Sequence, residues 1–163
     1  MKKLFIDYEV CNKCPECTAM CSYRLHPGNV GVDALREKIS FLFACRRCED
    51  YPCINACPNG ALKRVEGVNR RANMMCISCK SCAMACPFGT ILPEYLPYTV
   101  SGCDICLGRL AEGQAPACVT GCKANAVRFV EESELTEEKH LYRFGDNVLV
   151  RVVNWLEMNE LKK

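Results

Sequence analysis

The spacing of its cysteines constrains the fold of this chain more than any other feature. The 163 residues include sixteen cysteines, which fall into four runs of four with none left over. The runs are Cys11, Cys14, Cys17 and Cys21; Cys45, Cys48, Cys53 and Cys57; Cys76, Cys79, Cys82 and Cys86; and Cys103, Cys106, Cys118 and Cys122. Thiols this dense are typical of a disulfide scaffold or of metal sites, so the fold must be built around them.

The first and third runs have the spacing C-x2-C-x2-C-x3-C, and Pro87 follows the third run directly. This is the ferredoxin spacing, in which three thiolates hold one [4Fe-4S] cluster and the fourth reaches another cluster. At four thiolates per cluster, the sixteen cysteines predict four [4Fe-4S] clusters as cofactors. No run lacks a ligand, so every iron is expected to be fully coordinated. That favours electron transfer over catalysis at iron, and no catalytic residue is predicted.

Zinc and disulfides are the competing interpretations of the cysteines. Zinc sites usually pair two C-x2-C knuckles across a longer loop and often use histidine, whereas these runs are tighter and the chain has only two histidines. Disulfide scaffolds belong to secreted chains, but residues 1–10 lack the apolar core of a signal peptide. No apolar run approaches the ~20 residues of a membrane helix. We therefore expect a cytoplasmic protein, with export beside a signal-bearing partner as the open alternative.

The formal charge of the chain is misleading if it is taken alone. It is +2 with neutral thiols. Cluster binding removes sixteen thiol protons and adds about +8 from four oxidised cluster cores, so the net charge of the loaded protein is about −6. Nucleic-acid binding is therefore not predicted. The basic pairs Lys63-Arg64 and Arg70-Arg71 remain candidates for docking an acidic partner, although scattered basic pairs are more often simply solvated.

A repeated phrase follows three of the four runs. Cys57 to Leu62 (CPNGAL) matches Cys86 to Ile91 (CPFGTI), and Cys122 to Val127 (CKANAV) is a degenerate copy. Asn125 stands where Gly60 and Gly89 stand, and asparagine tolerates a left-handed backbone better than other non-glycine residues. We therefore expect one turn geometry at all three positions, with the trailing apolar residue starting a short strand. Residues 61–68, with a turn at Glu66-Gly67, are predicted to form a small hairpin.

These repeats predict an α+β fold with two ferredoxin-like dicluster modules, the inner one inserted within the outer one. The outer module would comprise 1–44 and 93–130, and the inner module 45–92. Residues 131–163 would form a C-terminal extension with an amphipathic helix from Asn147 to about Leu161, capped by Asp146. A short helix capped by Asp33 is also expected. Because the apolar core is small, metal binding should supply much of the folding free energy, and the apo-protein should be largely unfolded.

Three phrases carry a resemblance to a known family: Cys45 to Cys53 (CRRCEDYPC), Met75 to Cys82 (MCISCKSC), and Cys103 to Cys106 (CDIC) leading to Cys118. They resemble the four-cluster electron-transfer subunits of molybdenum and tungsten oxidoreductases and of energy-converting hydrogenase systems. That family includes iron-sulfur subunits of DMSO reductase, formate dehydrogenase, formate hydrogenlyase, carbon monoxide dehydrogenase complexes and tungsten aldehyde oxidoreductases. The likeness spans residues 11–130.

The resemblance implies a non-catalytic subunit of an oxidoreductase complex. Its partners would be a catalytic subunit of molybdenum, tungsten, nickel or hydrogenase type and a second redox subunit or ferredoxin, without nucleic acid and without direct membrane insertion. A free-standing, diffusible polyferredoxin is the alternative.

The resemblance also implies how the cysteines are shared among the clusters. The four sets would be Cys11, Cys14, Cys17 with Cys122; Cys103, Cys106, Cys118 with Cys21; Cys45, Cys48, Cys53 with Cys86; and Cys76, Cys79, Cys82 with Cys57. Cys21 and Cys122 depart from the pattern because no proline follows them.

Overall fold

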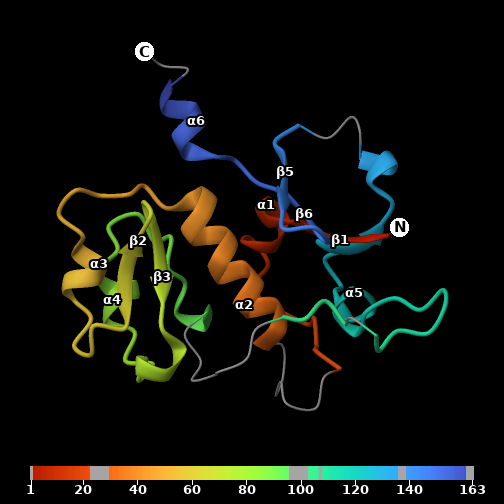
Figure 1. The fold of residues 1–163 in the computed structure, drawn as a ribbon, viewed down its shortest axis with the longest axis horizontal. Coiled ribbons are helices and arrows are strands. Elements are labelled where there is room, and N and C mark those ends of the chain that lie inside the picture. The colour runs from red at the N-terminus through yellow and green to blue at the C-terminus, as the bar shows by residue number, and fades with distance from the viewer. Residues whose placement is uncertain (1, 23–29, 96–102, 107, 136–138, 161–163) are drawn as a thin grey trace. The chain divides into compact units, whose positions relative to one another are not determined.

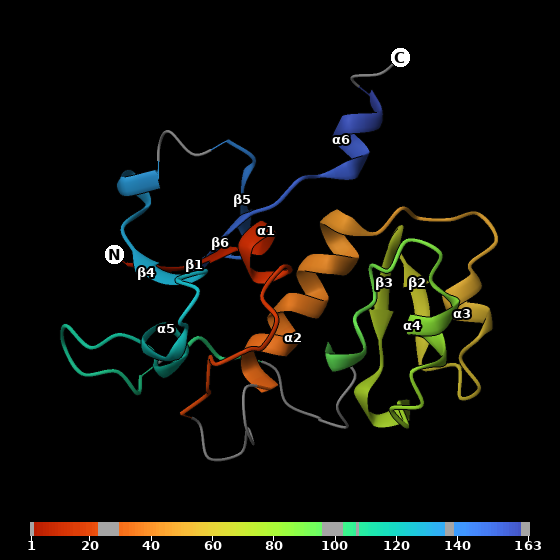
Figure 2. The same cartoon turned by 180° about the vertical axis from the view of Figure 1, so that it is seen from behind.

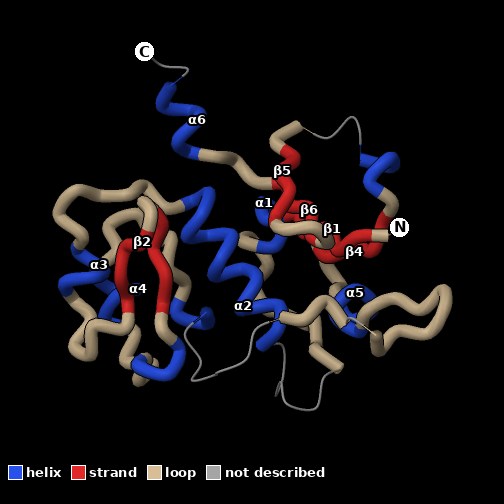
Figure 3. Tube along the Cα trace, viewed as in Figure 1, coloured by secondary structure: helices blue, strands red, loops and turns tan. Residues whose placement is uncertain are grey.

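The chain divides into two compact units, and each unit is assembled from two separate segments. The computed structural model describes residues 2–22, 30–95, 103–106, 108–135 and 139–160. Unit 1 comprises residues 1–32 and 101–153, and unit 2 comprises residues 33–100 and 154–163. Short helices and two small sheets make up the described chain, so the α+β class is confirmed (Figure 3).

Unit 1 is organised around a four-stranded sheet with the order β4-β1-β6-β5 (Figure 1). Its strands are β1 (Lys3–Asp7), β4 (Val127–Val130), β5 (Leu141–Phe144) and β6 (Val148–Arg151). The central strand β1 pairs antiparallel with β4 and parallel with β6, while β5 and β6 form an antiparallel hairpin. The helices α1 (Tyr8–Cys11) and α5 (Ala117–Gly121) and the 3-10 turn η4 (Glu132–Leu135) complete the described elements of this unit.

An apolar cluster is buried against the sheet of unit 1. Phe5, Leu135 and Leu149 form this cluster, with Val130 and Leu141 packed against it. Phe5 and Leu149 are opposite each other in the β1–β6 register and are 0% and 1% exposed. Strands buried on both faces read as continuous apolar runs, as Leu-Phe-Ile in β1 and Val-Leu-Val in β6 do.

The long C-terminal helix expected from Asn147 is wrong. Val148–Arg151 is the strand β6, and the helix α6 covers only Trp155–Glu160, while Leu161 lies outside the described residues. An apolar run of this length fits a buried strand as well as a helix, and its β-branched valines favour the strand. Asp146 does not cap a helix but lies in the turn between β5 and β6, beside Gly145 with φ 65°.

Unit 2 is built on the predicted hairpin. The strands β2 (Leu62–Val65) and β3 (Val68–Arg71) pair antiparallel with Val65 opposite Val68. Glu66 and Gly67 both have positive φ, 51° and 77°, as a two-residue hairpin turn of the favoured type requires. The helices α3 (Pro52–Asn55) and α4 (Ser81–Ala85) contact each other, and α3 also contacts β2 (Figure 2).

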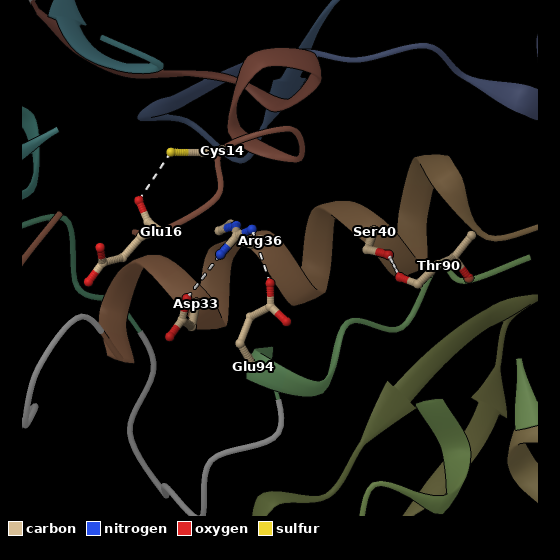
Figure 4. Close-up of polar contacts among 7 residues, drawn as sticks. All are labelled: Cys14, Glu16, Asp33, Arg36, Ser40, Thr90 and Glu94. Atoms are coloured by element: carbon tan, nitrogen blue, oxygen red, sulfur yellow. Dashed lines mark hydrogen bonds and ion pairs between the residues drawn. The ribbon is translucent and has the colours of Figure 1, made fainter. Parts of the chain in front are cut away.

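The helix expected after Asp33 begins earlier and continues further. Helix α2 covers Val30–Ile39, so Asp33 lies in its first turn rather than at its cap. A π-helical segment η1 (Ser40–Ala44) follows directly and contacts β3 and α6. The 3-10 turns η2 (Asn73–Met75) and η3 (Pro93–Tyr95) are the remaining elements. Two polar contacts hold α2 and η1 in place (Figure 4). Ser40 Oγ, at the start of η1, donates to the Thr90 carbonyl, and the Arg36 guanidinium on α2 lies 3.7 Å from the Glu94 carboxylate.

The repeated turn geometry is confirmed at all three positions, with φ of 58° at Gly60, 61° at Gly89 and 53° at Asn125. The expected strand follows in two of the three copies, because β2 begins at Leu62 and β4 at Val127. It is wrong for the copy after Cys86. There Ile91 is buried against the unit 2 core but belongs to no strand. Leu62 and Val127 each have a partner strand, β3 and β1, to pair with.

Candidate iron-sulfur cluster sites

All sixteen cysteines lie within the described residues, and none of them forms a disulfide. Unit 1 contains the first and fourth runs, from Cys11 to Cys21 and from Cys103 to Cys122. Unit 2 contains the second and third runs, from Cys45 to Cys57 and from Cys76 to Cys86. Each unit therefore holds eight thiols, enough for two [4Fe-4S] clusters.

One hollow in unit 2 is lined by Cys45, Cys48, Cys53 and Cys86 together. These are the four residues that the resemblance groups as one ligand set. Burial, followed by the nearby Cys45 and Cys86 thiols, raises the pKa of Cys53. Thiols whose negative charges repel one another at close range form a donor set suited to a positively charged core.

Cys86 differs from its neighbours in this hollow. Burial raises the pKa of its thiol, but hydrogen bonds to the thiolate outweigh burial and leave the pKa below its usual value. The donors are the Thr90 hydroxyl, whose oxygen lies 3.2 Å from the sulfur, and the backbone N–H groups of Phe88, Thr90 and Ile91. The turn at Gly89 brings these groups to the sulfur, which gives a physical reason for the repeated phrase after a cysteine.

A second hollow in unit 2 is lined by Cys57, Cys76, Cys79 and Cys82. Burial raises the pKa of Cys82 to about 11, and the neighbouring Cys57 and Cys76 thiols add to this shift. The Ala61 backbone N–H donates to the Cys57 sulfur over 3.2 Å. Cys79 is exposed, and the Ser81 hydroxyl and backbone N–H hold its pKa below the usual value. The hollow is thus lined by cysteines from two different runs.

In unit 1, Cys118 lies among three other thiols. Burial raises its pKa to about 12, with further contributions from Cys103, Cys106 and Cys21. Burial also raises the pKa of Cys103, although the Ile105 backbone N–H donates to its sulfur over 3.3 Å. Ile105 and Cys106 both have positive φ, 56° and 54°, so the backbone is wrapped tightly at this point. The fourth thiol of this group thus comes from the first run.

The remaining cysteines belong to the first and fourth runs, which meet at Thr18 and Gly121. Thr18 Oγ1 donates to the Gly121 carbonyl over 2.7 Å and accepts from the Lys123 backbone N–H over 3.1 Å. A Cβ on Gly121 would stand 2.9 Å from the Thr18 carbonyl oxygen, so this close approach requires glycine. These contacts hold the segment after Cys17 beside Cys122. Cys11 is buried at the end of α1, and the Cys14 thiol donates to the Glu16 carbonyl over 3.1 Å (Figure 4).

The sequence did not single out the polar side chains that approach the thiols of unit 2. Asn69 Nδ2 lies 3.7 Å from the Cys45 sulfur and 3.6 Å from the Cys53 sulfur, and the residue is 3% exposed. Arg71, two residues further along β3, hydrogen-bonds the Cys76 thiol and forms a bidentate pair with Glu37. Alternate residues of a strand lie on one face of its sheet. The predicted hairpin was therefore the one feature of the sequence that could have placed Asn69 and Arg71 on the same face.

Among the described residues, no three Cys, His, Asp or Glu side chains converge as the ligands of a single ion do. The thiolates of a [4Fe-4S] cluster bind irons at separate corners and therefore stand further apart than the ligands of one zinc ion. With N–H donors aimed at several sulfurs, the residues present fit a cluster.

Comparison with known families agrees with this geometry. Residues 38–132, more than half of the chain, match the 4Fe-4S dicluster domain. The chain belongs to this family. Its cofactors are [4Fe-4S] clusters, and its cysteines suffice for four of them. The resemblance to electron-transfer subunits is likewise confirmed by relatives with such names.

Three relatives illustrate the range of this dicluster family. The chain is 39% identical over 158 residues to the probable anaerobic dimethyl sulfoxide reductase chain YnfG of Escherichia coli, covering 83% of this chain and 76% of YnfG. It is 32% identical over 142 residues to the thiosulfate reductase electron transfer subunit PhsB of Salmonella typhi, covering 83% of this chain and 74% of PhsB. It is 40% identical over 99 residues to the putative oxidoreductase AegA of Escherichia coli, but this covers 56% of the chain and only 15% of AegA.

No helix among the described residues has the length and apolar character needed to cross a membrane.

Proposed function

We propose that this dicluster protein is a non-catalytic electron-transfer subunit that relays electrons through four [4Fe-4S] clusters. The relay would run between a catalytic metal-containing subunit of an oxidoreductase and a second redox partner. The observation that carries the proposal is that the thiols lie in groups of four, with no incomplete group in unit 2, where each hollow is lined by four cysteines. A fully ligated iron leaves no open position for substrate, so it can only exchange electrons.

The names of the relatives support the same function. PhsB is named an electron transfer subunit of thiosulfate reductase, and HydN of Escherichia coli, 33% identical over 114 residues, is named an electron transport protein. YnfG is named a chain of a dimethyl sulfoxide reductase. We propose a molybdenum, tungsten, nickel or hydrogenase-type catalytic subunit as one partner and a second redox subunit or ferredoxin as the other. The cytoplasm is the proposed location.

The proposal includes the four ligand sets and the nested arrangement of modules. Cys45, Cys48, Cys53 and Cys86 would hold one cluster of the inner module, and Cys57, Cys76, Cys79 and Cys82 the other. The two hollows of unit 2 support these sets. For the outer module, the thiols around Cys118 support the set with Cys21, and the Thr18 contacts support the set with Cys122.

When bound, the clusters supply one-electron redox chemistry, and the protein's own residues control it. The chain positions the thiolates, excludes water from buried ligands such as Cys53 and Cys82, and donates backbone N–H groups to the sulfurs. These are the features through which proteins set the potentials of iron-sulfur centres.

Anaerobic purification from the native host tests the function. We expect about sixteen irons per chain, from four clusters of four, and co-purification of a catalytic subunit that reduces or oxidises the clusters when its substrate is added. A chain that carries all four clusters but is isolated alone would instead be a diffusible polyferredoxin. Zinc in place of iron would overturn both.

Paired serine substitutions test the ligand sets. Cys86→Ser should alter the same electron paramagnetic resonance signal as Cys45→Ser, although the two cysteines belong to different runs. Cys57→Ser should alter the same signal as Cys76→Ser. If Cys57→Ser instead altered the signal affected by Cys45→Ser, each run would hold its own cluster, and the proposed nesting would be wrong.

A further inference from the structure

One buried polar side chain, Asn69, lies against the hollow lined by Cys45, Cys48, Cys53 and Cys86. Asn69, on β3, places its amide nitrogen 3.7 Å from the Cys45 sulfur and 3.6 Å from the Cys53 sulfur. Both distances are within the range of an N–H···S hydrogen bond. The Asn69 side chain is almost fully buried, as are the two cysteines that it approaches. One amide thus contacts two ligands of the same hollow, away from solvent.

The orientation of this amide is fixed by Arg64. The Arg64 Nε donates to the Asn69 Oδ1 over 3.1 Å. Because a guanidinium has no acceptor, only the carbonyl end of the amide can face it, and the NH₂ end must face the sulfurs. Arg64 is itself held by a hydrogen bond to the Cys48 carbonyl, at 3.2 Å, and by the face of the Tyr51 ring, 4.5 Å from its centroid. Cys48 and Tyr51 therefore hold Arg64 in place, and Arg64 in turn orients the Asn69 amide.

A hydrogen-bond donor held at a ligand sulfur acts on the two oxidation states unequally. Reduction by one electron adds a negative charge that is shared between iron and sulfur, so the N–H dipole stabilises the reduced state more than the oxidised state. Burial strengthens this difference because the local dielectric constant is low. The reduction potential of the cluster should therefore be higher with the amide than without it.

The other hollow of unit 2 has a different polar neighbour. Arg71 stands two residues after Asn69 on β3 and approaches Cys76, but its charge is offset by the bidentate pair with Glu37. The hairpin thus presents a neutral amide to one ligand set and a neutralised cation to the other. Each of the two sites has four cysteines, and the sites differ in these polar neighbours.

We propose that Asn69, oriented by Arg64, raises the reduction potential of the cluster held by Cys45, Cys48, Cys53 and Cys86. Arg64 acts as a positioning residue through Asn69. The inference rests on the proposed function, because it requires a cluster at this site.

The test is an anaerobic redox titration of the loaded protein, with each cluster followed by its electron paramagnetic resonance signal. The signal of this site is identified as the one altered by Cys45→Ser. In Asn69→Leu, which keeps the shape of the side chain but removes the donor, the ratio of reduced to oxidised cluster at a fixed potential should fall about tenfold, or 59 mV for a one-electron couple. Asn69→Asp should lower it further, because the carboxylate can still accept from Arg64 but brings negative charge to the sulfurs.

Asn55→Leu is the matched control. Asn55 lies on α3 beside the same ligands, but it is exposed and its amide donates to the Asp50 carbonyl over 2.8 Å rather than to a sulfur. This variant should leave all four potentials unchanged. A loss of packing would change the potential without regard to the charge of the new side chain. A reduction potential that falls from wild type to Asn69→Leu and again to Asn69→Asp therefore indicates an electrostatic effect.

A second pair of variants keeps the proposal testable if Asn69→Leu does not retain the cluster. Arg64→Met should lower the potential of this site, since Asn69 loses its anchor, whereas Lys63→Met removes the same charge from an exposed neighbour and should not. An unchanged potential in Asn69→Leu with the cluster intact, or equal effects of Arg64→Met and Lys63→Met, would overturn the inference. Protein without any cluster would overturn the proposed function instead.

Discussion

The two units of the molecule surround their cysteines in different ways. In unit 1, the buried cluster of Phe5, Leu135 and Leu149 lies in a four-stranded sheet and contains no cysteine. In unit 2, the buried cluster includes Cys53 and Cys82 beside apolar side chains such as Leu62. Unit 1 also buries a cysteine, Cys11 at the end of α1, but the apolar cluster of its sheet is formed without one. Part of the burial in unit 1 therefore does not depend on thiols, whereas in unit 2 the buried cluster includes them.

Removal of the clusters should expose this difference most strongly. In the apo-protein we expect the backbone amides of β2 and β3 to lose their protection from hydrogen exchange, because metal binding and folding are coupled where ligands form the core. The amides of β1 and β6 should keep more of theirs, since the buried cluster of Phe5, Leu135 and Leu149 on their sheet is apolar. This refines the expectation from sequence of a largely unfolded apo-protein. Hydrogen exchange before and after anaerobic iron chelation measures it, and equal loss in both sheets would contradict the comparison.

Unit 2 also depends on a buried ion pair. The Arg71 and Glu37 side chains are 4% and 9% exposed, and Glu37 holds the pKa of Arg71 above its usual value despite burial. Glu37→Gln removes the carboxylate of a buried ion pair and keeps the buried cation, so we expect the free energy of unfolding to fall by about 3–5 kcal/mol. The matched control is Glu66→Gln, at the exposed pair with Arg70, which should change it by less than about 0.5 kcal/mol.

Denaturant unfolding of the loaded protein under anaerobic conditions, followed by cluster absorbance, measures both variants. The potential of the cluster beside Arg71 is a second readout, since Glu37→Gln also removes the carboxylate that pairs with this arginine. Similar losses of stability in Glu37→Gln and Glu66→Gln would mean that burial does not matter to this pair.

The sequence predicted the features of this molecule that are local. The spacing of the cysteines and the repeated phrase led to the turns at Gly60, Gly89 and Asn125 and to the β2–β3 hairpin, because each depends on residues only a few positions apart. The sheet of unit 1 was missed. It joins Lys3–Asp7 to two strands more than a hundred residues later, and nothing in a single sequence records such a pairing.

The neighbours of the thiols were missed for a related reason. Arg64 and Arg71 appeared as members of basic pairs suited to docking, yet both have partners inside the molecule. Asn69 resembles any turn or surface asparagine in the sequence. Only the register of the hairpin, which places Arg64 opposite Asn69, shows that these two side chains line the same hollow.

A buried carboxyl gives unit 2 a pH dependence of its own. Burial raises the pKa of Asp33 from 3.8 to about 6, although Arg36 opposes the shift. The folded state therefore holds this proton more tightly than the unfolded state, so the stability that it contributes is greatest below about pH 4 and is lost as pH rises through about 6. A shift of this size corresponds to about 3 kcal/mol in all, of which about 1 kcal/mol should disappear between about pH 5 and pH 7.

The variant Asp33→Asn cannot ionise and should not show this loss of stability with rising pH. Hydrogen exchange of the β2 and β3 amides, corrected for the intrinsic effect of pH, reports the change in unit 2, while β1 serves as an internal reference in unit 1. A wild-type protein whose unit 2 became more stable across this interval would show that Asp33 is better compensated by Arg36 than the direction of its pKa shift indicates.

The smallest expected effect on stability concerns a turn geometry that occurs once in each of the compared segments. Gly60 in unit 2 and Asn125 in unit 1 both have left-handed backbones, with φ of 58° and 53°. A Cβ added at Gly60 would meet nothing within 4 Å, so Gly60→Ala should cost only the backbone strain, about 1 kcal/mol. Gly60→Asn should cost less than Gly60→Ala, because asparagine tolerates this region. Thermal unfolding of the three proteins measures the order. Equal costs for alanine and asparagine would mean that the unit 1 turn owes its asparagine to something other than backbone geometry, and the correspondence between the two turns would then be limited to their shape.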